Sequence, residues 1–333
     1  MRALVCTGYN DEFEVELHRK PKVTEVGANE VLIKVHYASV SHAVGLMIAG
    51  KYQTKPSIPF VPGTEAVGEV IGIGSQVSRL RVGMRVIAVN NFGCYADNIV
   101  VPEYTVYSIP PQLELLQALP IPISYGTAYT ALLWRACLQP TDTVLILGAG
   151  AGVGLAAVEV AAQAGAQVIA CTSTADKRRA VLQHGATKAV SPDGCLAEKV
   201  KNLTNGQGVS VLFDPVGGEL ANNALRATAP NGQILSIGFA SGSLPQYAPN
   251  YLLVKNLTLH GFFFGRYLGW TLTDERIQHA PALQVVMEKL LEWAASGRIS
   301  PVVSKTYPIE QLDKALYALQ KRDIVGKVAI SFV

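Results

Sequence analysis

The chain has 333 residues, 49% hydrophobic and 16% charged, with a formal net charge of +3 and a mean hydropathy of +0.25. This length suits roughly two domains, and the apolar composition excludes a disordered chain. The densest basic run, residues 177–179, is too short for a nucleic-acid surface, so we expect neither a nucleic-acid nor a membrane partner.

The cysteines and the longest apolar run indicate the compartment. The five cysteines are far apart and form no C-x-x-C pair, which favours neither a zinc ribbon nor a secreted disulfide framework. Residues 144–162 are apolar, but their glycines suit a buried strand and a buried helix better than a membrane span. The first residues resemble a strand and not a signal peptide. We therefore expect a reduced, cytoplasmic protein.

Residues 1 to about 120 predict a compact β-rich domain. Short segments of alternating hydrophobicity are broken at close intervals by Gly and Pro. These segments are VLIKVHYA, EAVGEVIGIG, RVIAV and ADNIVV.

From residue 119 the pattern becomes helical, beginning with LPIPISYGTAYTALLW. Between residues 143 and about 262, apolar strands alternate with helical stretches, which predicts a parallel sheet with helices on both faces. The expected strands are TVLIL, QVIAC, KAV, VSVLFD, QILSIG and LTLHGFF, with helices near 153–164, 176–184, 195–204 and 219–228.

After the predicted sheet, residues 281–296 have the 3.6-residue spacing of an amphipathic helix. The C-terminal VGKVAISFV reads as a strand that returns to the first domain. The fold class is therefore α/β, with a β-rich domain over residues 1–122 completed by 266–333, and a doubly wound dinucleotide-binding domain over 123–265.

The segment VLILGAGAGVGLAAVEVAAQAG, residues 144–165, predicts a nucleotide site. A dinucleotide fingerprint needs a tight turn after a strand, close approach of the backbone to the pyrophosphate, and tight packing of the next helix. Counted back from Gly154, the fingerprint positions hold Ala149, Ala151 and Gly154. We expect the helix to begin at Gly152 and Val153, with phosphate contacts at Gly150, Ala151, Gly152 and Val153. The alternative is a Gly-rich turn that binds nothing.

The end of the second predicted strand distinguishes the two nicotinamide cofactors. An NAD site has a carboxylate there, which binds the ribose 2′-hydroxyl. This chain has Cys171 or Thr172 at that position, followed by a group of hydroxyls and cations that suits a 2′-phosphate: Ser173, Thr174, Lys177 and Arg178. The cofactor predicted is therefore NADPH. The alternative is a solvated helix start, whose charge Asp176 would dilute.

Several motifs taken together are similar to one family over nearly the whole chain. They are VHYASV…GKY, PGTEAVGEVIGIG, GMRVIAV, SYGTAYTAL, AGAGVG, STADK, VLFDPVGG, ILSIGFASG and GKVAI. The chain resembles the zinc-independent quinone oxidoreductase branch of the medium-chain dehydrogenase/reductase family. The resemblance implies a GroES-like β-rich catalytic domain, a Rossmann domain and a homodimer.

The resemblance also bears on metal content. Zinc members of the family use a cysteine and a histidine where this chain has Ser41 and Thr64. His42 and Glu65 are conceivable ligands, but they lack the cysteine partners of a zinc site, so we expect no metal. Without a Lewis acid, the expected reaction is hydride transfer from NADPH to a quinone or an α,β-unsaturated carbonyl.

The resemblance implies roles for individual residues. Thr127 would lie against the nicotinamide, with Ser41 and His42 on the opposite wall, in a cleft between the domains. Tyr52 matches the tyrosine that related enoyl thioester reductases use as an acid or an anchor, so the catalytic residues implied are Tyr52, Thr127 and Ser41. The remaining cofactor contacts implied are Val216, Phe239, Ala240, Phe262, Phe263, Phe264 and, closing the pocket, Lys327.

Two departures from the family pattern leave alternatives open. Relatives often have asparagine at the position of Ser41 and tyrosine at that of Leu46, so a standard quinone pocket is not assured. One alternative is a 2-enoyl thioester reductase with Tyr52 as proton donor and a basic entrance at Lys51, Lys55 and Arg266. Another is a non-catalytic NADPH-binding sensor, in which Tyr52 only packs. The strand LTLHGFFF, expected near the end of the sheet, would pair with its twin in a homodimer or be an ordinary buried strand.

Overall fold

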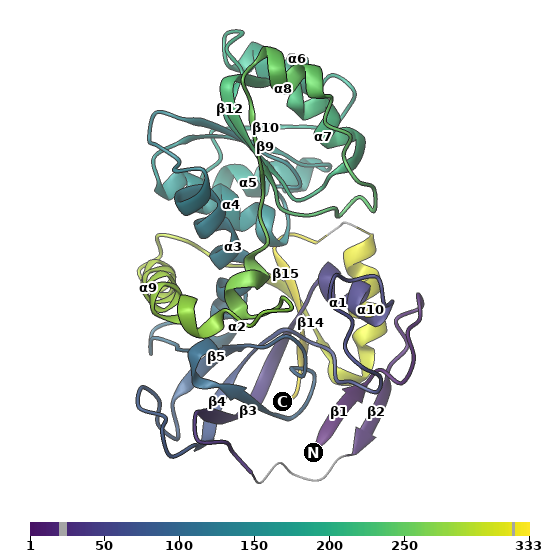
Figure 1. The fold of residues 1–333 in the computed structure, drawn as a ribbon, viewed down its shortest axis with the longest axis vertical. Coiled ribbons are helices and arrows are strands. Elements are labelled where there is room, and N and C mark those ends of the chain that lie inside the picture. Colours follow the sequence, from purple (N-terminus) through teal and green to yellow (C-terminus); the bar gives the residue numbers. More distant parts are fainter. Residues whose placement is uncertain (20–24, 322–323) are drawn as a thin grey trace. The chain divides into compact units, whose positions relative to one another are not determined.

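The computed structural model describes residues 1–19, 25–321 and 324–333 and divides into two compact units (Figure 1). The first unit comprises Met1–Ile123, Gly265–Gly297 and Pro301–Val333. The second comprises Ser124–Phe264 together with the short segment Arg298–Ser300, which the sequence did not assign to it.

The first unit is built on a sheet with the strand order β14-β15-β3-β4-β5-β7, in which β6 also pairs with β3. Its strands are β3 (Glu30–Val40), β4 (Glu65–Ile73), β5 (Arg85–Val89), β6 (Asn98–Pro102), β7 (Val106–Ser108), β14 (Val303–Pro308) and β15 (Lys327–Ser331). A separate antiparallel pair joins β1 (Arg2–Val5) to β2 (Glu16–Arg19). The predicted β-rich domain is confirmed, and so is the returning C-terminal strand, because β15 pairs antiparallel with β3.

Helical segments cover parts of this sheet. They are α1 (His42–Ile48), η1 (Glu103–Thr105), α2 (Leu115–Ala118), η4 (Phe264–Leu268), α9 (Arg276–Ala295), η5 (Ile309–Gln311) and α10 (Leu312–Gln320). The apolar spacing predicts α9 only from residue 281, whereas the helix begins five residues earlier and holds Pro281 inside it. Proline is a poor residue for a helix interior, which is why local sequence favoured a later start.

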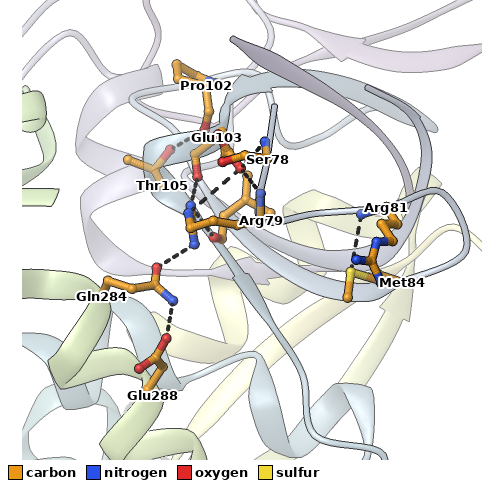
Figure 2. A network of polar contacts seen from close by, with 10 residues as sticks. Ser78, Arg79, Arg81, Met84, Pro102, Glu103, Thr105, Gln284 and Glu288 are labelled. Atoms are coloured by element: carbon orange, nitrogen blue, oxygen red, sulfur yellow. Dashed lines mark hydrogen bonds and ion pairs between the residues drawn. The ribbon is translucent and has the colours of Figure 1, made fainter. Parts of the chain in front are cut away.

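A polar network ties segments of the first unit that are far apart in the sequence (Figure 2). The carboxylate of Glu103, which is 6% exposed, accepts the N–H groups of Ser78 at 3.1 Å and Arg79 at 2.7 Å. The Arg79 guanidinium donates to the carbonyl of Glu103 at 2.6 Å and to Oε1 of Gln284 at 2.8 Å. The network therefore fastens α9 to the loop before β5 and to η1.

The second unit is built on a parallel sheet with the order β10-β9-β8-β11-β12-β13. Its strands are β8 (Thr143–Ile146), β9 (Gln167–Cys171), β10 (Lys188–Val190), β11 (Val209–Asp214), β12 (Thr228–Ser236) and β13 (Thr258–Gly261). Numbered within the unit, this order is 3-2-1-4-5-6, the doubly wound Rossmann arrangement. The order reverses between β8 and β11, so ligands are expected at the carboxyl ends of these strands.

Helices lie on both faces of this sheet (Figure 1). They are α3 (Gly126–Tyr129), α4 (Gly152–Gln163), α5 (Ala175–Gln183), α6 (Leu196–Leu203), α7 (Gly218–Leu225) and α8 (Pro249–Val254). Helices α6 and α7 bury Leu196 and Leu225 in a core with Leu145 and Ile234 of the strands. The helical pattern predicted from residue 119 takes an unexpected form, because α3 is flanked by the π-helical turns η2 (Ile121–Tyr125) and η3 (Thr130–Arg135).

Candidate functional site

The glycine-rich turn between β8 and α4 is the centre of the candidate site. The backbone is left-handed at Gly148 (φ 59°) and Gly152 (φ 48°), a conformation that costs glycine little. A Cβ on Gly154 would collide with the carbonyl oxygen of Gly148. Gly154 is therefore the position at which α4 must pack closely on the turn, as the fingerprint alignment predicts.

The turn is open on one side and covered on the other. Apart from its chain neighbours and the backbone of its own helix, no described residue has an atom within 4 Å of a Cβ built on Gly152, and α4 begins there with Ala151 as its N-cap. The first N–H groups of a helix have no acceptor within it and attract anions. A Cβ on Gly150, in contrast, would lie 2.8 Å from both Thr172 Oγ1 and Lys177 Cδ. An anion can thus approach the turn at Gly152 and Val153, while Gly150 provides space for Lys177.

Helix α5 places Lys177 against this turn. Its N-cap is Thr174, whose hydroxyl accepts the N–H of Lys177 at 3.2 Å. Lys177 is only 6% exposed, and its stem lies over Gly150. The predicted 2′-phosphate residues and the predicted pyrophosphate turn are consequently neighbours in space.

A second cation lies at the end of β9. Nη1 of Arg178 donates to the carbonyls of Thr172 at 3.2 Å and Ser173 at 3.0 Å, which holds the guanidinium beside the exposed Ser173. Asp176, which the sequence suggested would dilute the local charge, forms an exposed ion pair with Arg179. The structure therefore gathers Ser173, Arg178, Thr174 and Lys177 around one strand end.

The carboxyl ends of β11, β12 and β13 carry the other cofactor contacts predicted for this unit. A Cβ on Gly148 would lie 2.9 Å from Val216 Cγ2, so Val216 packs on the glycine turn. The N–H of Ala240 donates to the carbonyl of Pro215 at 3.1 Å, and the neighbouring Phe239 is 42% exposed. The N–H of Phe262 donates to Ser236 at 3.0 Å, which places it where β12 ends. The half-buried Phe263 and the buried Phe264 follow directly.

Sequence reasoning missed Asp214, the last residue of β11. Its side chain is fully buried, and Oδ1 accepts the N–H groups of Val216 at 2.9 Å and Gly217 at 2.8 Å. Oδ2 accepts the hydroxyl of Tyr247 at 2.9 Å. Burial raises the pKa of Asp214, and these hydrogen bonds oppose the rise. The only sequence signal was an acid inside VLFDPVGG, two residues before the predicted cofactor residue Val216.

Thr127 lies on the buried helix α3 and is 8% exposed. The preceding tyrosine, Tyr125, donates its hydroxyl to the carboxylate of Glu159 in α4. Glu159 also binds Nδ1 of His184 at 2.7 Å and accepts the N–H of Ser300 at 2.9 Å. The helix that carries Thr127 is thereby fastened to the helix of the glycine turn.

In the first unit, Ser41 and His42 begin α1. The Ser41 hydroxyl caps this helix by accepting the N–H of Val44 at 3.4 Å, and His42 is exposed. Tyr52 packs partly buried against the hydrophobic core, and this burial raises its pKa to about 12. A pocket of about 300 Å³ lies beside α1, with His42 and Leu46 among its lining residues.

Lys327 and Glu65 form a buried ion pair in the first unit. Nζ of Lys327 contacts Oε1 of Glu65 and donates to Ser39 Oγ at 2.9 Å. Oε2 of Glu65 accepts the N–H of Ile123 at 3.2 Å. The resemblance implies that Lys327 closes the pocket, but its ammonium is held in this buried ion pair. Glu65, considered as a metal ligand, is held in the same pair.

The side chains considered for a metal ion and for a basic entrance can also be located. Across residues 1–19, 25–321 and 324–333, no three His, Cys, Asp or Glu side chains lie close enough to hold one. The basic entrance considered for a thioester is also largely neutralised, because Lys51 pairs with Asp11 at 2.7 Å and Arg266 pairs with Glu275 at 2.9 Å. None of the helices in the described ranges is long and apolar enough to cross a membrane.

Comparison with known proteins identifies similar domains and similar whole chains. Residues 27–111 match the alcohol dehydrogenase GroES-like domain, and residues 152–279 match the zinc-binding dehydrogenase domain. The quinone oxidoreductase-like protein 2 homolog of Nematostella vectensis is 37% identical, covering 99% of this chain and 88% of that protein. Quinone oxidoreductase-like protein 2 of Rattus norvegicus is 34% identical over 99% and 92%.

A solved structure shares the fold. Escherichia coli quinone oxidoreductase, complexed with NADPH, superimposes with a TM-score of 0.88 at 24% identity, covering 99% of this chain and 100% of that one. The predicted fold class, a GroES-like domain with a Rossmann domain, is confirmed.

Proposed function

Because the chain belongs to the quinone oxidoreductase branch of the medium-chain dehydrogenase/reductase family, whose members are oxidoreductases, we propose that it is an NADPH-dependent, zinc-independent reductase of quinones or α,β-unsaturated carbonyls. The observation that carries the proposal is the position of Lys177, whose Cδ would lie 2.8 Å from a Cβ on Gly150. It supports a nucleotide site in which the predicted pyrophosphate turn and the predicted 2′-phosphate residues are neighbours. When bound, NADPH supplies the hydride.

The residues of the second unit fit this cofactor. The N–H groups at Gly152 and Val153 bind the pyrophosphate through the open side of the turn. Ser173, Lys177 and Arg178 bind the 2′-phosphate at the end of β9. Gly150 is indispensable in this arrangement, because a side chain there would displace Lys177 or Thr172.

Variants of the adjacent cations test the cofactor preference. Lys177→Met keeps the stem over Gly150 and removes the charge, and Arg178→Gln removes the second cation. One charge-assisted hydrogen bond corresponds to roughly a tenfold change in affinity, so each variant should raise the KM for NADPH by about that factor. The KM for NADH should stay within about twofold, because NADH has no 2′-phosphate to bind these groups.

Arg179→Gln is the matched control, since Arg179 is adjacent but pairs with Asp176 at the surface. It should leave both KM values unchanged. Equal losses with NADPH and NADH in Lys177→Met would contradict the proposed preference.

Three residues are proposed to act on the acceptor. Thr127 and Ser41 orient it, and the hydroxyl of Tyr52 stabilises the negative charge that develops on its oxygen. Burial raises the pKa of Tyr52 to about 12, so Oη keeps its proton throughout the neutral range and can donate a hydrogen bond to that oxygen. The proposed acceptors are already electron-poor, so hydride can add to them without a Lewis acid.

Turnover with a panel of acceptors tests this part. NADPH oxidation would be followed with a 1,4-naphthoquinone, a conjugated enone and an enoyl-CoA, on the wild type and on Tyr52→Phe. We expect turnover of the first two and a fall of about 10²-fold or more in kcat for the variant. Turnover of enoyl-CoA alone would establish a thioester reductase, and tight NADPH binding without any turnover would establish a sensor. An unchanged kcat in Tyr52→Phe would assign Tyr52 to packing.

The proposed partner is a second copy of the chain. β13 ends the sheet order, and among the described residues it pairs only with β12; Leu259 on it is 43% exposed. The preceding helix, α8, exposes Leu253 and Val254 at 78% and 80%. An unpaired strand edge beside apolar side chains favours pairing with an identical edge.

Light scattering should show a dimer for the wild type, and Leu259→Lys should dissociate it. Leu272→Lys is the control, because Leu272 is a fully exposed leucine of the first unit, and it should leave the dimer intact. A wild-type monomer would refute this.

A further inference from the structure

One buried carboxylate joins two loops at the edge of the parallel sheet. The side chain of Asp214 binds the N–H groups of Val216 and Gly217, and it also accepts the hydroxyl of Tyr247 from the loop that follows β12. Its backbone carbonyl accepts the N–H of Ile237 at 2.8 Å, at the beginning of that second loop. Asp214 therefore contacts the start of one loop and both ends of the other.

The two loops also pack directly on each other. The N–H of Ser241 donates to the carbonyl of Val216 at 2.9 Å, and that of Ala240 donates to Pro215 at 3.1 Å. A Cβ on Gly217 would lie 2.8 Å from the carbonyl oxygen of Ser243, so the loops approach as closely as a glycine allows. Through Val216 the first loop in turn rests on the glycine turn at Gly148. A displacement of either loop is thus transmitted to the candidate nucleotide site.

We infer that Asp214 is a positioning residue for the nucleotide: together with Tyr247 it holds residues 215–217 and 237–247 in the arrangement that presents Val216, Phe239 and Ala240 to the cofactor. The inference rests on the proposed function. It differs from the roles proposed for Lys177 and Arg178, because Asp214 contacts neither the end of β9 nor any group that distinguishes NADPH from NADH.

Tyr247→Phe is the decisive variant, because it removes one hydroxyl and leaves the tyrosine ring in the core. Binding of NADPH and of NADH would be measured by fluorescence titration. We expect the Kd of both to rise about three- to tenfold, the effect of one lost hydrogen bond to a charged group. At saturating cofactor kcat should change little. Tyr251→Phe, in the adjacent α8 and on the same core, is the matched control and should bind like the wild type.

A second pair of variants concerns Asp214 itself. Asp214→Ala should weaken both cofactors by about 10- to 100-fold, since it releases three hydrogen bonds. Asp214→Asn should recover most of the affinity, because its amide oxygen still accepts the two N–H groups and its nitrogen can donate to Tyr247. Where Asp214→Ala does not fold, Tyr247→Phe and Asp214→Asn still decide the question.

Hydrogen exchange without any cofactor gives an independent readout. In Tyr247→Phe the amides of Ala240 and Ser241 should exchange faster than in the wild type, while those of helix α4 should not. If the wild type binds both cofactors and Tyr247→Phe binds them with unchanged Kd, the positioning role is overturned and the proposed function stands. If the wild type binds neither cofactor, both are overturned.

Discussion

Replacing Lys327 by methionine separates a structural role from the cofactor role that family resemblance implies. The ammonium pairs with Glu65 and donates to Ser39 at 2.9 Å, inside the sheet of the first unit. Methionine keeps most of the length of the side chain and removes the charge. The variant would then contain a carboxylate, 1% exposed, that has lost its counter-ion and keeps one hydrogen bond, to the N–H of Ile123.

The burial of this pair sets the expected magnitude. The side chains are 6% and 1% exposed, so water cannot replace the lost partner. Breaking a buried ion pair by removing one member typically costs about 3–5 kcal/mol. We therefore expect Lys327→Met to lower the free energy of unfolding by about that amount. Removing both charges should be milder, because no unpaired ion remains.

Urea unfolding followed by circular dichroism would measure the change, with Lys314→Met as the control. Lys314 is exposed on α10 of the same unit, and its replacement should change stability by less than about 0.5 kcal/mol. The double variant Lys327→Met with Glu65→Gln should be more stable than Lys327→Met alone. The structural explanation fails if Lys327→Met unfolds like the wild type while its KM for NADPH rises, since that is the behaviour of a cofactor ligand.

Two further predictions concern the second unit and the thiols. Gly154→Ala should destabilise the protein by about 1–3 kcal/mol in thermal unfolding and weaken NADPH binding, because its Cβ meets a backbone oxygen of the turn. Gly194→Ala, with no atom within 4 Å of its Cβ, should be neutral or slightly stabilising, and equal effects would refute the packing argument. All five cysteines lie in described parts of the chain, and at pH 8 a disulfide reagent should rapidly modify only the exposed Cys137 and Cys195. Burial raises the pKa of Cys171 to about 12, so its reaction before unfolding would contradict the structure.

The sequence by itself determined the elements of the Rossmann domain and the location of its nucleotide turn. Apolar strands of three to nine residues and the helices between them are specified by neighbouring residues, so their periodicity was sufficient. Gly154 was also identifiable, because close packing of a helix on its own preceding turn is a local requirement.

Only the tertiary structure decided which polar groups meet. Lys327 and Glu65 are 262 residues apart, and Asp214 and Tyr247 are separated by 33. No periodicity encodes such pairs, because they arise when strands and loops from different parts of the chain come together at one edge or in one core. The same holds for Lys177: the sequence indicates a surface cation, but the fold buries its side chain against the glycine turn at Gly150. Burial and pairing depend on the whole fold, whereas helices, strands and turns depend mainly on adjacent residues.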